Sequence, residues 1–79
     1  MGVLDVVERV ARAVLEARVR RVDESTLVIE YPYGYRETIA VRGGRATITL
    51  CDEANRCSQK TVTVDSLMEA ARFLLAEGE

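Results

Sequence analysis

The sequence predicts an α+β protein of two layers, in which two helices cover one face of a four-stranded antiparallel sheet. Hydrophobic residues repeat at helical spacing near both ends of the chain, and they alternate at every second position across its middle. Two turn signals, Pro32 to Gly34 and Gly43-Gly44, divide the alternating part into segments of strand length. The expected order is therefore α-β-β-β-β-α, with the strands paired in sequence as a meander.

The length predicts a single domain over residues 1–79. Hydrophobic residues make up 48% of the chain and charged residues 30%, which is typical of a folded protein and not of a disordered one. A domain of this size buries only roughly 60% of the surface that its unfolded chain exposes. We therefore expect a thin hydrophobic core.

The first predicted helix covers about residues 3–20. Val3, Val7, Val10 and Val14 follow the spacing that places side chains on one face of a helix. The opposite face places an acidic residue four positions before a basic one, which is the favourable order for helical ion pairs. These expected pairs are Asp5 with Arg9, Glu8 with Arg12, and Glu16 with Arg20.

The predicted strands cover about residues 26–31, 36–42, 45–51 and 57–64, and the short loops between them set the register. Leu27 then opposes Ile39, and Ile39 opposes Ile48. A shift of one residue would move every side chain to the other face, so the register can be tested by how it sorts hydrophobic residues. It places one hydrophobic set on the core face: Leu27, Ile29, Ile39, Val41, Ile48, Leu50, Val62 and Val64.

The opposite face of the sheet collects small and polar residues. Threonine forms strands well, so this face can be read simply as a solvated surface. A small protein with a thin core gains further burial from a two-fold dimer, so the face is also a candidate interface. Its candidate interface residues are Val28, Thr38, Ala40, Thr47, Thr49, Thr61 and Thr63.

The second predicted helix covers about residues 66–77. Ser66 and Glu69 have the spacing of a capping box, in which each side chain bonds a backbone N–H of the other. Leu67, Ala71 and Leu75 supply an apolar stripe at helical spacing.

The chain has two cysteines, Cys51 and Cys57, and no histidine. A zinc site needs about four cysteine or histidine ligands, so a site within one chain is not expected. A thioredoxin-like redox pair would have two intervening residues at the start of a helix, and here five residues lie in a hairpin. The register places the two cysteines opposite each other, which predicts a disulfide; free thiols are the alternative.

The composition also indicates an environment. One lysine stands against ten arginines, and asparagine and glutamine occur once each. Depletion of thermolabile residues is typical of hyperthermophiles, in which intracellular disulfides are common, although a GC-rich genome would also enrich arginine. Asp5 and Glu8 interrupt any signal-peptide core, and no apolar run approaches the ~20 residues of a membrane span. We therefore expect a cytoplasmic thermophile protein without a membrane partner.

An enzyme is not expected. Histidine, the commonest general acid–base, is absent, and the serines have no base to activate them. No glycine pattern that holds phosphates appears, and no cofactor is implied. The sequence favours a small interaction or accessory domain that forms a homodimer or binds a protein partner.

The alternative is nucleic-acid binding. A formal net charge of −2 argues against a protein built mainly to neutralise phosphates, but a local basic patch remains compatible with it. A simpler interpretation pairs arginines with acids, such as Glu16 with Arg20 or Glu30 with Arg36. The candidate nucleic-acid-binding residues are Arg18, Arg20, Arg21, Arg42, Arg45 and Tyr33.

Overall fold

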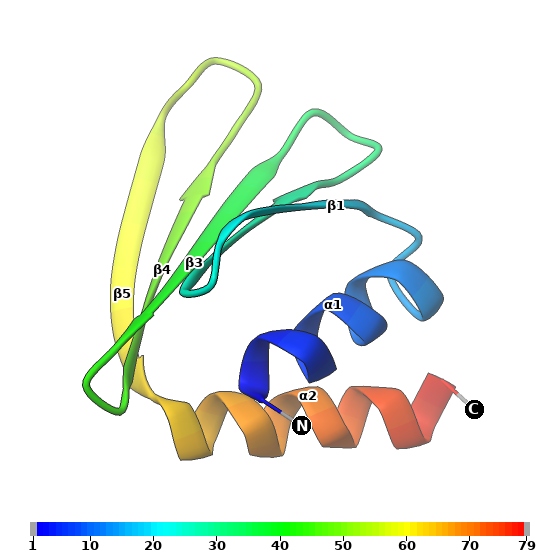
Figure 1. The fold of residues 1–79 in the computed structure, drawn as a ribbon. Helices are drawn as coiled ribbons and strands as arrows, with labels where there is room; N and C mark the ends of the chain where they lie inside the picture. Colours follow the sequence, from blue (N-terminus) through cyan, green and yellow to red (C-terminus); the bar gives the residue numbers. More distant parts are fainter. Residues whose placement is uncertain (1, 79) are drawn as a thin grey trace.

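The computed structural model describes residues 2–78, and Figure 1 shows both helices on one side of an antiparallel sheet. This confirms the α+β class. The sheet has five strands in the sequential order β1-β2-β3-β4-β5, so the prediction of four strands was wrong. The elements are α1 Val3–Ala13, β1 Arg18–Asp23, β2 Thr26–Glu30, β3 Arg36–Arg42, β4 Arg45–Cys51, β5 Cys57–Thr63 and α2 Val64–Gly78.

The additional strand, β1, comes from the segment that was predicted to finish the first helix. α1 ends at Ala13, and Glu16 has a φ of 53°, a left-handed conformation that reverses the chain. β1 then pairs with the open edge of β2, which places Val19 opposite Ile29. Cross-strand pairing beside the core therefore overrides a helical spacing built from valine, which is a mediocre helix former.

The predicted register is confirmed at each hairpin. Leu27 opposes Ile39, Ile39 opposes Ile48, and Cys51 opposes Cys57. Gly43 and Gly44 have φ angles of 58° and 77°, the left-handed conformation that a two-residue hairpin turn needs.

α2 begins two residues earlier than predicted. Ser66 does not act as the cap; its backbone N–H donates a hydrogen bond of 3.1 Å to Oγ1 of Thr63. Thr63, the last residue of β5, is therefore the N-cap, and the helix follows the strand without a loop.

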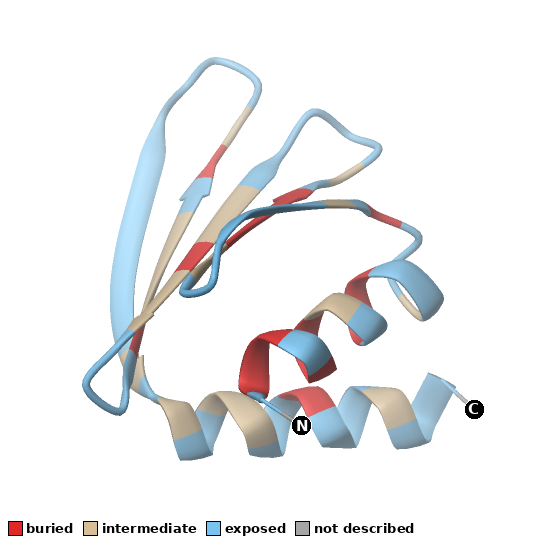
Figure 2. Cartoon of the chain, in the orientation of Figure 1, coloured by how far each residue is buried: buried red, intermediate tan, exposed pale blue. Residues whose placement is uncertain are grey.

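The core lies between α1 and the first half of the sheet (Figure 2). α1 packs against β1 and β2 on one side and against α2 on the other. Leu27, Ile29 and Ile39 are buried as predicted, whereas Leu50 remains 39% exposed. Among the described residues of α2, Ala71 alone is buried, and β5 is largely exposed. The second half of the sheet is therefore thinly covered. No helix within residues 2–78 is long and apolar enough to cross a membrane.

Candidate functional site

The face of the sheet that points away from the helices carries two kinds of residue, arginines and threonines. Side chains of a strand alternate between its two faces, so the residues between the core positions of β2 to β4 point outward. The register extends this outward set to β1 and β5. We call it the arginine–threonine face: Arg18, Arg20, Thr26, Val28, Glu30, Arg36, Thr38, Ala40, Arg42, Arg45, Thr47, Thr49, Gln59, Thr61 and Thr63, with the Cys51–Cys57 disulfide at one end.

The five arginines of this face are exposed, and none of them makes an ion pair with another residue of the described chain. One acidic residue, Glu30, lies among them, in register between Arg18 and Arg36. Asp23 lies at the margin, opposite Thr26. The expected partner of Arg20, Glu16, is not bonded to it in the described structure, because α1 ends before Glu16.

Arginines elsewhere behave differently, because several have acidic partners close by. Nε of Arg12 lies 3.2 Å from Glu8, as the helical spacing predicted, and Nε of Arg56 lies 3.2 Å from Asp52. The helices hold five acidic residues against three arginines. Although the net charge is −2, the charge is therefore divided between a basic sheet face and an acidic helical layer.

The candidate nucleic-acid-binding residues are not all brought together. Arg18, Arg20, Arg42 and Arg45 share the arginine–threonine face. Arg21 points to the helical side, where its Nη2 lies 2.8 Å from Oδ1 of Asp5 and 3.7 Å from Glu8. Tyr33 stands at the tip of the β2–β3 loop and is 80% exposed.

Arg36 belongs to the same face but was not among the predicted site residues. It opposes Glu30, as predicted, yet no ion pair joins the two in the described chain. Strand alternation alone would have placed Arg36 on this face, because it lies two residues before Thr38.

The predicted interface residues also lie on this face, so one surface contains the candidate interface and four of the six candidate nucleic-acid-binding residues. Thr38 opposes Thr49, and Thr47 opposes Thr61, which forms an uncharged centre. Val28 is only 7% exposed although it points outward. Arg18 and Arg36 lie at one end of this centre, and Arg42 and Arg45 lie at the other. Arg20 lies beside the centre, on the edge strand β1, opposite Val28.

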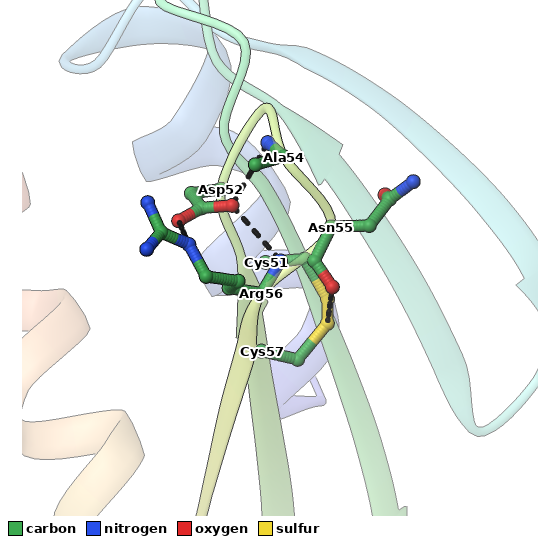
Figure 3. Close-up of a disulfide and its surroundings, with 6 residues drawn as sticks. All are labelled: Cys51, Asp52, Ala54, Asn55, Arg56 and Cys57. Carbon is green, nitrogen blue, oxygen red and sulfur yellow. Dashed lines mark hydrogen bonds and ion pairs between the residues drawn. A yellow bond between two sulfur atoms is a disulfide. The ribbon is translucent and has the colours of Figure 1, made fainter.

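The Cys51–Cys57 disulfide is present, and Figure 3 shows how the loop that it closes is held. Oδ1 of Asp52 accepts hydrogen bonds of 2.9 Å from the backbone N–H groups of both Ala54 and Arg56. Asn55 takes a φ of 60°, which asparagine tolerates better than most residues. The disulfide therefore sits at the end of the face and closes a turn that Asp52 holds with hydrogen bonds.

On the core side, Glu37 finds a partner in Tyr31. The Tyr31 hydroxyl donates a hydrogen bond of 2.8 Å to Oε1 of Glu37. Burial raises the pKa of the Tyr31 hydroxyl well above its usual range, and the bond to the Glu37 carboxylate raises it further. Lys60, which also points to the core side, makes no ion pair with Glu37 in the described structure.

A groove of ≈ 220 Å³ opens between the helices and the thinly covered part of the sheet. Its walls are mostly apolar and include Leu15, Ile48, Ala70 and Leu74. Phe73 lies on α2 nearby and is 63% exposed. This is a second surface, separate from the arginine–threonine face.

Among residues 2–78, no cluster of three or more metal-ligating side chains occurs. No protein-family model matches the sequence, and no curated protein or solved structure is significantly similar to the chain.

Proposed function

We propose that the protein binds nucleic acid by contacting its phosphates with the arginine–threonine face. The observation that carries this proposal is the presence of five exposed arginines without ion-pair partners among residues 2–78 on one sheet face. Arginine donates several hydrogen bonds in a planar arrangement that matches a phosphate, and it stays charged at every physiological pH.

The pairing of Arg42 with Arg45 supports the proposal. These residues are directly opposed across the β3–β4 hairpin, where like charges destabilise a sheet. A cross-strand pair of arginines therefore costs stability in the free protein, and a bound anion would offset that cost. The same charges argue against a dimer formed by packing this face on its copy, because five arginines would meet five more.

The test compares single charge reversals of equal size. Arg45→Glu removes a proposed phosphate contact, whereas Arg72→Glu makes the same change of charge on exposed α2. We expect Arg45→Glu to weaken binding to random-sequence RNA and DNA on the order of tenfold at low salt. The number of phosphate contacts, obtained from the salt dependence of the binding constant, should fall by about one. Fluorescence anisotropy with labelled oligonucleotides measures both.

Stability measurements separate a binding effect from a folding effect. Arg45→Glu places an acid opposite Arg42, so we expect it to raise the free energy of unfolding by roughly 0.2–1 kcal/mol while it weakens binding. Equal weakening by Arg45→Glu and Arg72→Glu would show that only net charge matters. Absence of binding by the unmodified protein at low salt would refute the proposal.

A second candidate function is protein interaction through α2, and the exposed Phe73 favours it. Homodimerisation stays a prediction. Because the charge of the arginine–threonine face disfavours packing on its own copy, the proposed dimer interface is the apolar groove beside Ala70 and Leu74. Light scattering on a sizing column is the test. A dimer that becomes monomeric with Phe73→Glu would support this function, and a monomeric unmodified protein at high concentration would oppose it.

A further inference from the structure

We infer that the nucleic acid held by the arginine–threonine face is an A-form RNA duplex, contacted across its minor groove. The inference rests on the proposed function and adds the class of ligand to it. Four properties of the face carry it: the absence of a stacking platform, the separation of its two groups of arginines, its width, and its hydroxyl-rich centre.

Proteins that bind single strands commonly stack bases on aromatic side chains. The arginine–threonine face has none of them. Tyr31 points to the core side, where it bonds Glu37, and Tyr35 pairs with Tyr31 at the base of the loop. Phe73 lies on α2, and Tyr33 stands at a loop tip beyond the sheet. The face can therefore hold phosphates and sugars, but it offers no surface for unstacked bases.

The arginines form two groups with an uncharged space between them. Arg36 and Arg42 are the two ends of β3, six residues apart, which corresponds to about 20 Å along an extended strand. Arg18 extends the first group and Arg45 extends the second, whereas Arg20 lies at the edge of the neutral centre, opposite Val28. Two groups of cations on either side of a neutral centre match the two phosphate backbones that border one groove, and match a single backbone poorly.

The width of the face distinguishes the two kinds of duplex. Five strands spaced at about 4.8 Å make a surface roughly 19 Å across. The major groove of B-form DNA, ≈ 12 Å wide, admits one helix or a two-stranded ribbon, and the minor groove is narrower still. The minor groove of A-form RNA is wide and shallow, so a broad sheet face can lie over it.

The centre of the face carries hydroxyl groups at the place where RNA exposes its own. Thr38 opposes Thr49 and Thr47 opposes Thr61, and each hydroxyl can both donate and accept a hydrogen bond. The shallow minor groove of A-form RNA displays 2′-hydroxyls, which DNA lacks. Threonine hydroxyls can therefore distinguish the two duplexes without reading a sequence.

The experiment measures affinity for four probes of one mixed sequence of 24 nucleotides at one salt concentration: RNA duplex, DNA duplex, and each single strand of the RNA. We expect the RNA duplex to bind about tenfold or more tightly than either single strand, and several times more tightly than the DNA duplex. Tighter binding of a single strand, or equal binding of the two duplexes, would overturn the inference while leaving the proposed function intact. Failure of all four probes to bind would refute the proposed function itself.

A variant isolates the hydroxyl contribution. Thr38→Val/Thr49→Val keeps the β-branched shape that favours a strand and removes two opposed hydroxyls. We expect it to reduce the preference for the RNA duplex over the DNA duplex at least twofold, with affinity for DNA unchanged. Ser58→Ala is the matched control, because it removes a hydroxyl from the core side of β5. The double variant should have an unchanged far-ultraviolet spectrum, which shows that it folds. If its ratio of affinities for the RNA duplex and the DNA duplex is then also unchanged, the role of the threonines is contradicted.

Discussion

Reduction of the Cys51–Cys57 disulfide should destabilise the fold by an amount that the loop length sets. The two cysteines are six residues apart, and the chain-entropy relation for so short a loop gives about 2–2.5 kcal/mol at 25 °C. For a domain of this size, each kcal/mol shifts the melting temperature by roughly 4–8 °C. We therefore expect the melting temperature to fall by roughly 8–20 °C.

The assay is denaturant unfolding with and without a phosphine reductant, which can reach the bond because Cys57 is exposed. Reduction keeps both sulfur atoms, so it removes the cross-link without opening a cavity beside Cys51, which is 6% exposed. Cys51→Ala/Cys57→Ala is the control, and its stability should not respond to the reductant. Intact mass must rise by two hydrogens on reduction. Equal unfolding free energies for the oxidised and reduced protein would refute the reasoning.

Two further predictions concern the core side of the sheet. Leu27→Ala, at a fully buried position, should lower the unfolding free energy by about 2–5 kcal/mol, whereas Val22→Ala at a 55% exposed position should change it by less than about 0.5 kcal/mol in chemical denaturation. Because the pKa of the Tyr31 hydroxyl is raised in the folded protein, the unfolded chain loses this proton at a lower pH. This hydroxyl should therefore leave the free energy of unfolding unaffected below pH ~10 and should lower it as the pH rises above that value. Tyr31→Phe should remove part of that alkaline loss, and an identical pH profile for the variant would show that another group causes it.

The strand register was predictable because the turns fix it locally. Gly43 and Gly44 allow one tight hairpin, and the loop from Pro32 to Gly34 allows another, so the alternation of hydrophobic residues has one consistent solution. The disulfide follows directly from that register. These features depend on residues close in sequence, which a pattern of spacing describes well.

The first strand was not predictable in the same way. Val10 and Val14 continue the helical spacing, and no glycine or proline marks the end of α1. The chain reverses at Glu16, which takes a left-handed conformation that a glutamate does not signal. Pairing with β2 decides the outcome, and that partner lies further along the chain.

This error also concealed the candidate site. In a helix, Arg18, Arg20 and Arg21 form one cluster at its end. In a strand, Arg21 turns to the helices and binds Asp5, while Arg18 and Arg20 join the threonines on the opposite face. The candidate interface and four of the six candidate nucleic-acid-binding residues therefore share one surface, and only the correct strand assignment places Arg18 and Arg20 on it.

The salt dependence of nucleic-acid affinity tests the central claim most directly. If five arginines each replace a counterion on a duplex, the logarithm of the binding constant should fall against the logarithm of salt concentration with a slope of about −4.5. Over a rise from 50 to 200 mM salt, this slope corresponds to a loss of roughly several hundredfold in affinity. We expect a slope between about −3 and −5 for the unmodified protein, and a slope less steep by about one unit for Arg45→Glu. A slope near zero, or no binding at the lowest salt, would contradict the account.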